Sequence, residues 1–108
     1  MRPIDPAVLE LHDAVLLGVE SDLVHHRLRV RLDVYLDDDS DARHHCVIAF
    51  EDVERHVETL DWSELGEHAT AGNVSHWLPA AGAGTTVFHC AHGFLSVTAG
   101  RIDALVDG

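Results

Sequence analysis

Alternation of apolar and polar residues is the clearest pattern in the chain, and it is strongest around residue 30. Val30, Leu32 and Val34 alternate there with charged residues. A period of two places successive side chains on opposite faces of a strand, so we expect a strand from about residue 25 to 36. One face of this strand should pack in the core, and the other should be an Arg-rich surface in water.

A second alternating run precedes this strand, and the pair Ser21–Asp22 between the two runs is typical of a turn. We therefore expect a strand over residues 11–21 that forms a hairpin with the next strand. The competing interpretation is a helix, because Asp5 could cap it, Pro6 could be its first residue and Gly18 could end it. The alternation favours the strand.

Residues 43–52 carry apolar side chains in both phases, which indicates a more central strand of the sheet. Beyond it, apolar residues recur at helical spacing. These residues are Phe50, Val53, Val57 and Leu60. The pattern leaves residues 51–59 open, either as a short helix or as a continuation of the strand.

Asp61 fits the N-cap of a helix, and a Glu follows it at the third helical position. Leu60 and Leu65 occupy the two positions of a hydrophobic staple across this cap. We expect a short helix from about residue 62 to 71, which Gly72 ends.

The last third of the chain shows short apolar runs separated by turn residues, which predicts further strands. They cover residues 74–78, 85–91, 94–99 and 102–106. His92–Gly93 would form the turn of a hairpin, and the last run would be an edge strand. The predicted fold class is α+β: one domain over residues 1–108, mainly an antiparallel β meander of about six strands with one or two short helices.

The net charge is the most unusual feature of the composition. Seven Arg and no Lys stand against 19 Asp and Glu, a formal net charge of -12 at pH 7. Such a field repels phosphate, which argues against nucleic acid, and attracts a basic protein, mainly by raising the association rate. The residues predicted to contribute to this attraction are Asp37, Asp38, Asp39, Asp41, Glu51, Asp52, Glu54 and Glu58.

The sequence offers no sign of export or of membrane insertion. No apolar run of signal-peptide length follows the N-terminus, and no window approaches the roughly 18 apolar residues of a membrane span. Only Cys46 and Cys90 are present, too few for a disulfide scaffold. We therefore expect a cytoplasmic protein with two buried free thiols.

Histidine and cysteine concentrate at a few places, and both are ligands that zinc prefers. Strand parity would allow one site at the core edge, formed by His44, Cys46, Cys90 and His92. Neither cysteine belongs to a Cys-x-x-Cys pair, so the spacing is not that of a zinc knuckle. The interpretation we favour is core cysteines with edge or surface histidines, and no cofactor.

The sequence gives little indication of catalysis or of recognition by exposed aromatic residues. No serine lies in a nucleophile elbow, and a buried thiol is inert, so the sequence shows no catalytic constellation and we expect no enzyme. Trp62 and Trp77 flank the predicted helix. Core packing is expected for both, although an exposed aromatic among acidic residues would suit a binding hot spot.

Three short motifs carry a resemblance to known proteins. They are His-Asp-x-x-Leu at His12–Leu16, Gly-Asn-Val at Gly72–Val74, and the closing segment Gly93–Ala99. With them the chain resembles small uncharacterised bacterial β-rich domains, some of which are grouped with the immunity proteins that bind and neutralise bacterial toxins. The resemblance implies a stoichiometric binder rather than an enzyme, and it transfers no functional residues.

The leading hypothesis is therefore an acidic protein-binding domain for a basic partner, which the resemblance extends to an immunity protein against a basic toxin. Two alternatives stay open. One is a small domain that binds or is stabilised by a metal through its His and Cys residues, and the other is a homodimer joined through an open β-edge.

Overall fold

The alternating pattern around residue 30 forms strand β3 (Arg27–Tyr35) in the computed structural model, which describes residues 1–36, 42–69 and 72–107. Leu28, Val30 and Leu32 are no more than 1% exposed, whereas Arg29 between them is exposed. The prediction of one core face and one Arg-bearing face is confirmed.

Strand β2 (Val15–Asp22) pairs antiparallel with β3, which confirms the predicted hairpin. Ser21 belongs to the strand and residues 23–26 form the turn, so the predicted place of the turn is wrong. β2 begins at Val15 rather than at residue 11 because the chain turns at Asp13, whose φ is 62°. Asp tolerates this left-handed conformation better than most residues do.

The helix-start signal at Asp5 has only a local effect. Asp5 accepts a hydrogen bond from the backbone N–H of Ala7 (2.9 Å), and Pro6 opens a single 3-10 turn, η1 (Pro6–Val8). The chain before η1 forms a short strand, β1 (Arg2–Ile4), which the sequence pattern does not predict.

Strand β4 (Arg43–Thr59) is continuous, so residues 51–59 extend the strand and do not form a helix. β4 bends at Asp52, where φ is 52°, and its register against β7 (Gly93–Val106) shifts between Val53 and Arg55. β7 passes this bend with Gly100, where a Cβ would lie 3.0 Å from the Cβ of Asp52. A glycine therefore allows the two long strands to bend together.

β7 also joins two segments that the sequence pattern separates. Residues 94–99 and 102–106 belong to this one strand. The second of these segments pairs with β4 on one side and with β1 on the other, so its predicted place at a sheet edge is wrong. Gly100 lies inside this strand, beside the bend of β4, so the glycine does not mark the end of a strand here.

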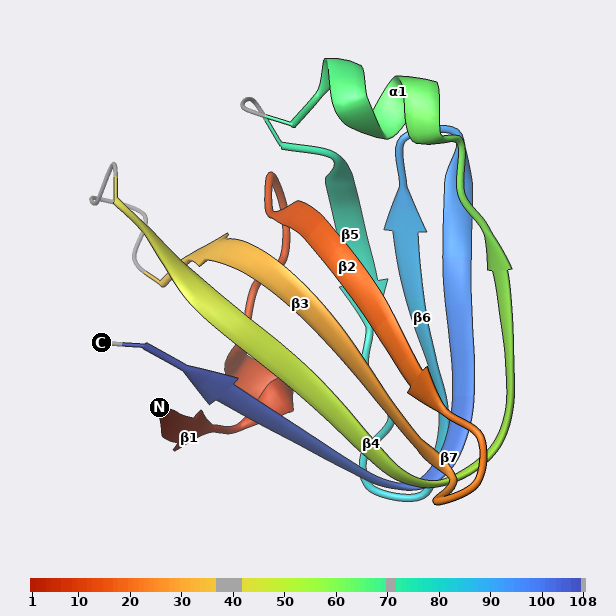
Figure 1. Ribbon diagram of the computed structural model, residues 1–108. Coiled ribbons are helices and arrows are strands. Elements are labelled where there is room, and N and C mark those ends of the chain that lie inside the picture. The colour runs from red at the N-terminus through yellow and green to blue at the C-terminus, as the bar shows by residue number, and fades with distance from the viewer. Residues whose placement is uncertain (37–41, 70–71, 108) are drawn as a thin grey trace.

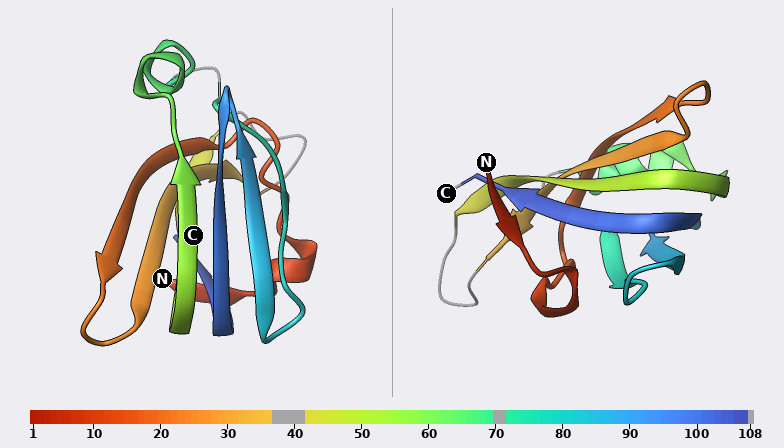
Figure 2. Two further views of the ribbon diagram at one scale, coloured as in Figure 1. Left: turned by 90° about the vertical axis from the view of Figure 1, so that its right-hand side faces the viewer. Right: turned by 90° about the horizontal axis from the view of Figure 1, so that it is seen from below.

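Seven strands of the described residues form one antiparallel sheet in the order β2-β3-β4-β7-β6-β5, with β1 beside β7. The remaining strands are β5 (Val74–Leu78) and β6 (Gly84–Cys90). Because β4 and β7 both bend sharply, the sheet folds over on itself (Figure 1). Two arms result: the first holds β2, β3 and the start of β4, and the second holds the end of β4 with β6 and β5 (Figure 2).

The core fills the space between the two arms. Phe50 of the first arm meets Phe88 of the second edge to face, with ring centroids 6.3 Å apart. Trp77 stacks on Phe88 at 5.5 Å, and its indole N–H donates to the carbonyl of Leu9 (2.8 Å). Core packing of Trp77 is therefore confirmed.

One short helix, α1 (Trp62–Glu67), follows β4. Asp61 caps it as predicted, by accepting a hydrogen bond from the backbone N–H of Glu64 (3.1 Å). The helix ends before the predicted residue 71, and Gly72 does not form its end. Among the described helices, none has the length and apolar character needed to cross a membrane.

Candidate functional site

The acidic residues predicted to attract a partner have different surroundings. Asp37, Asp38, Asp39 and Asp41 lie outside the described residues. Glu51 pairs with Arg27, whose Nε lies 3.1 Å from Glu51 Oε2, and Asp52 occupies the bend of β4. Glu54 and Glu58 are exposed on the end of β4, so these two are the described members that present a carboxylate beside a strand edge.

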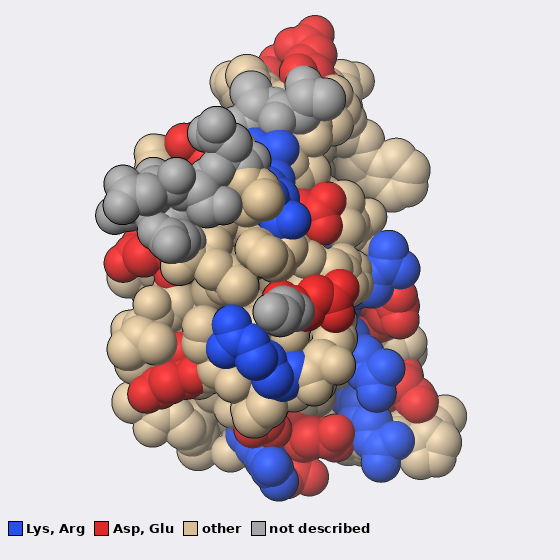
Figure 3. All heavy atoms as spheres, turned by 90° about the vertical axis from the view of Figure 1, so that its left-hand side faces the viewer, with Lys and Arg blue, Asp and Glu red and all other residues tan. Residues whose placement is uncertain are grey.

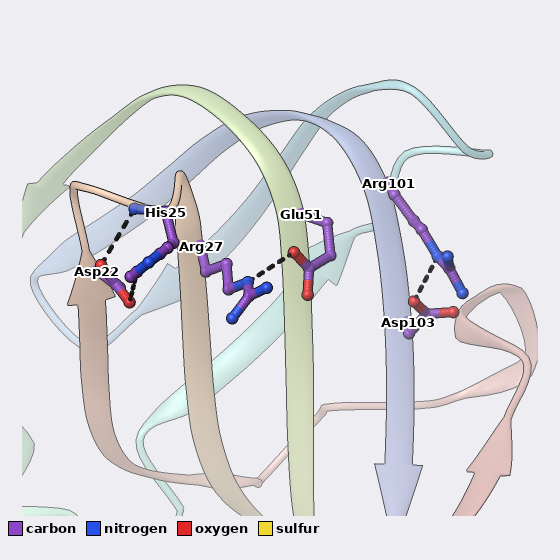
Figure 4. A network of polar contacts seen from close by, with 6 residues as sticks. All are labelled: Asp22, His25, Arg27, Glu51, Arg101 and Asp103. Carbon is purple, nitrogen blue, oxygen red and sulfur yellow. Dashed lines mark hydrogen bonds and ion pairs between the residues drawn. The ribbon is translucent and has the colours of Figure 1, made fainter.

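Two Arg residues of the first arm, Arg27 and Arg31, pair with carboxylates. Arg31 Nη1 lies 3.3 Å from Glu20 Oε1. Figure 4 shows the Arg27–Glu51 pair and a further pair on β7, Arg101–Asp103. Blue and red side chains accordingly lie next to each other on this face (Figure 3). Exposed pairs of this kind contribute roughly 0–1 kcal/mol each to stability, but they offset the positive charge that an anionic ligand would need.

A polar contact also fixes the turn between β2 and β3. The ring Nδ1 of His25 lies 2.8 Å from Asp22 Oδ2, and the backbone N–H of His25 donates to Asp22 Oδ1 (3.2 Å) (Figure 4). These hydrogen bonds lower the pKa of the Asp22 carboxyl. The pair is a turn-stabilising contact on the surface.

The four candidate metal ligands occupy separate places. His44 and Cys46 lie on β4, where Cys46 pairs with Leu32 of β3 and is buried. Cys90 ends β6, and His92 lies in the following turn with φ 54°, so the parity argument for a shared face does not apply to it. Within residues 1–36, 42–69 and 72–107, no three His, Cys, Asp or Glu side chains form a group that could hold a metal ion.

Both cysteines are free thiols. Cys46 is buried, and Cys90 is half-buried. Burial raises the pKa of the Cys46 thiol to about 12 and that of Cys90 to about 11. Since the thiolate is the nucleophile, neither sulfur is activated for covalent chemistry.

Two of the three short sequence motifs, His12–Leu16 and Gly72–Val74, meet in space. The backbone N–H groups of Asn73 and Val74 both donate to the carbonyl of Ala14 (3.0 Å each), and Asp13 N–H donates to the carbonyl of Val74 (3.0 Å). Gly72 has a φ of 116°, and a Cβ there would lie 2.5 Å from the carbonyl oxygen of Asp13. The motifs thus form a backbone junction between the start of β2 and the start of β5.

The side chain of Asn73 completes this junction. Its Oδ1 accepts from the backbone N–H of Leu16 (2.7 Å), and its Nδ2 donates to the carbonyl of Leu65 (3.2 Å). Its own backbone carbonyl accepts from Ala91 (2.9 Å). Asn73 is 4% exposed, so one buried residue ties β2, α1 and the turn between β6 and β7 together.

Beside this junction the sheet stays open between two strand edges. β2 has a single neighbouring strand, β3, among the described residues. β3 pairs with β4 only as far as Phe50, so the end of β4 beyond the bend pairs with β7 alone. Near the bend, the turn between β2 and β3 contacts β4 through a hydrogen bond from Val53 N–H to the carbonyl of His26 (2.9 Å). Towards α1, β2 and the end of β4 line an open space.

This space is a groove of ≈ 360 Å³, which we call the β2–α1 groove. Its lining comprises residues 16–19 of β2, Glu58 of β4, Leu60 just after β4, and Trp62 and Leu65 of α1. Trp62 is 84% exposed and Leu17 43% exposed, so the groove presents large apolar side chains to solvent. The expectation that Trp62 packs in the core is wrong: α1 places it at the groove rim.

Glu58 points into this groove from the core-facing side of its strand. It lies opposite Leu95 of β7, which is fully buried, and directly opposed residues share a face of the sheet. Its Oε1 lies 3.5 Å from Nε2 of His56. The groove therefore combines an apolar lining with one inward-facing carboxylate.

The chain around the groove is strongly acidic. Residues 54–67 contain five Asp and Glu and one Arg, which gives 1 − 5 = −4. Asp61, Glu64 and Glu67 of this segment lie on or beside α1. A cationic group in the groove would be attracted by Glu58 and by these neighbours.

The groove cannot be recognised from the sequence, because its lining comes from segments more than 30 residues apart that the folded sheet brings together. One signal was present: a tryptophan among acidic residues, directly after an N-cap. No protein-family model matches the chain, and neither a curated protein nor a solved structure is found that resembles it.

Proposed function

We propose that this domain binds a basic protein and that the partner docks on the β2–α1 groove. The observation that carries the proposal is the position of Trp62, which is 84% exposed at the rim of an apolar groove with Glu58 inside it. Tryptophan is enriched among the residues that dominate binding energy at protein interfaces. An exposed tryptophan over an apolar lining is costly to leave in water and gains most when a partner covers it.

The charge around the groove supports a basic partner. Residues 54–67 carry a formal charge of −4, and the whole chain carries -12. Opposite charges accelerate association and suppress wrong partners more than they strengthen the final complex. The apolar lining would supply most of the affinity, and the carboxylates would select and steer the partner.

The resemblance to immunity proteins supports a narrower form of the proposal, in which the basic partner is a toxin that the domain neutralises in a stoichiometric complex. The motifs behind this resemblance build the junction next to the groove. In that case they matter for binding by holding β2 and α1 in place, and they need not touch the toxin.

The experiment compares the wild-type domain with Trp62→Ala and with a control, Val8→Ala. Val8 is 69% exposed on η1, outside the groove, so the control also removes an exposed apolar side chain. Proteins that the wild-type domain retains from the cells that encode it are identified and purified, whether or not the two variants also retain them. Binding of the purified protein is then measured by titration calorimetry, and its association rate at low and high salt.

We expect a basic protein whose affinity falls at least about tenfold with Trp62→Ala and stays unchanged with Val8→Ala. Its association rate should fall steeply between about 0.05 M and about 0.5 M salt, because salt screens the attraction. A partner that is acidic, that binds Trp62→Ala as tightly as wild type, or that associates equally fast at both salt concentrations contradicts the proposal.

A further inference from the structure

The open edge of β2 also offers backbone N–H and C=O groups that another strand could pair with. In an antiparallel edge strand, every second residue directs its backbone N–H and C=O away from the sheet. Among the described residues, the outer edge of β2 has one such partner: the N–H of Leu16 donates to Asn73 Oδ1 (2.7 Å). From Leu17 to Asp22 the edge is open to another strand.

The surroundings of this edge say what kind of strand would fit. Leu16 and Val19 lie opposite the buried Leu32 and Val30 of β3, so both direct their side chains toward the groove. Trp62 and Leu65 close the α1 end of the same groove, and Glu58 lies on its far wall. An apolar side chain would therefore be covered there, and a basic one would meet a carboxylate.

From these observations we infer that the partner contributes an extended segment that pairs with the open edge of β2 as an added strand. Every second residue of this segment faces the groove, and these residues are apolar except for one basic residue opposite Glu58. The inference rests on the proposed function and specifies how the groove is used. Main-chain hydrogen bonds to residues 17–22 supply part of the affinity, and the groove selects the side chains, as in other cases of strand addition.

A second copy of this chain is a poorer occupant. It would bring its own acidic segment, residues 54–67, against the same segment of the first copy, and like charges in close contact are unfavourable. An inward-facing charge such as Glu58 is also a known obstacle to pairing between identical edges. The same carboxylate attracts lysine or arginine, so the charge distinguishes a basic strand from a second copy.

The test uses a synthetic ten-residue peptide with both ends blocked, in which every second residue is valine except the middle one of that set, which is lysine, and the residues between them are threonine. Two further peptides carry N-methyl groups on alternate residues, one on each of the two possible sets. In a bound strand, alternate backbone N–H groups point to opposite sides, so only one of the two sets faces β2. Methylation of that set blocks strand pairing, and the peptide methylated on the other set is a control with the same composition. Affinities are measured by calorimetry, and hydrogen exchange with mass spectrometry locates the protected backbone amides.

We expect the parent peptide and one methylated peptide to bind equally well, and the other to bind on the order of tenfold or more weakly. Exchange should slow in residues 17–22 of β2. Glu58→Gln should weaken binding more than Asp107→Asn, which removes one exposed carboxylate from the far end of β7 (Figure 1).

The inference is overturned if both methylated peptides bind as well as the parent, if no peptide binds, or if protection appears elsewhere than β2. It is also overturned if Glu58→Gln leaves peptide binding unchanged and instead makes the domain self-associate in light scattering, because Glu58 would then only prevent pairing between copies. A protein partner that depends on Trp62 without protecting β2 would leave the proposed function standing while refuting strand addition.

Discussion

Replacing Asn73 with Ala should destabilise the domain more than any other single loss of a polar side chain at the β2–β5 junction. The substitution removes two hydrogen bonds, one from the Leu16 N–H (2.7 Å) and one to the Leu65 carbonyl (3.2 Å). The residue is 4% exposed, so water replaces these bonds poorly. As a result, β2 and α1 each lose their hydrogen bond to the residue that directly precedes β5.

The magnitude follows from the bonds lost. Each neutral hydrogen bond contributes about 0.5–1.5 kcal/mol, and a buried group left without a partner costs about 1–3 kcal/mol. Since the two partners are backbone groups at partly buried sites, we expect a loss of about 2–4 kcal/mol in the free energy of unfolding. For a domain of this size that corresponds to a decrease in melting temperature of roughly 8–20 °C.

The assay is urea unfolding followed by circular dichroism, with thermal unfolding as a second measurement. Ser75→Ala is the matched control, because the Ser75 hydroxyl makes one exposed hydrogen bond, to the carbonyl of His89 (3.0 Å). Its loss should cost less than about 1 kcal/mol. If Asn73→Ala costs no more than Ser75→Ala, the junction does not stabilise the fold in the way described.

Three further predictions concern strain, thiols and metal. Gly72→Ala should lower the melting temperature more than Gly82→Ala, because both sites have a positive φ but only at Gly72 would the new Cβ meet backbone, 2.5 Å from Asp13 O; equal losses would show that the contact is unimportant. Iodoacetamide at about pH 8 should label Cys46 and Cys90 slowly in the native protein and rapidly in urea, since burial raises both thiol pKa values; rapid native labelling of Cys46, read by mass spectrometry, would contradict its burial. Zinc should leave the melting temperature unchanged because the candidate ligands do not gather among the described residues, and a rise of several degrees would restore the metal hypothesis.

The strands that the sequence predicts well are those whose pattern is purely local. β3 alternates without interruption, and burial follows that alternation residue by residue. β5 has the predicted bounds, Val74–Leu78, because a glycine and a proline flank it. In both cases the information sits within a few residues of the strand.

The end of β4 could not be assigned from the sequence because its bend imitates a helix. Phe50 and Val53 pair with Ile102 and Ala99 of β7 and contact the core, yet they are three residues apart. A regular strand would separate residues of one face by two or four positions. The bend at Asp52, where φ is 52°, allows residues three positions apart to contact the core together, and the extra residue of the register shift comes only after Val53. The apolar spacing then resembles that of a helix.

Less of the candidate site than of the fold could be predicted from the sequence. Acidity was evident, and two of its predicted carriers, Glu54 and Glu58, lie on the strand end that borders the groove. Whether Trp62 would be buried depends on where α1 packs, and the Asn73 junction depends on segments almost 60 residues apart. Such contacts are properties of the folded sheet, which short-range periodicity does not encode.

The most direct measurement of the central claim follows the two tryptophans separately while the partner binds. The domain is labelled with 5-fluorotryptophan, and Trp62→Phe assigns the two fluorine NMR signals. If the partner covers the β2–α1 groove, the signal of exposed Trp62 shifts on binding while that of buried Trp77 stays in place. A complex that forms with the Trp62 signal unchanged would contradict the claim.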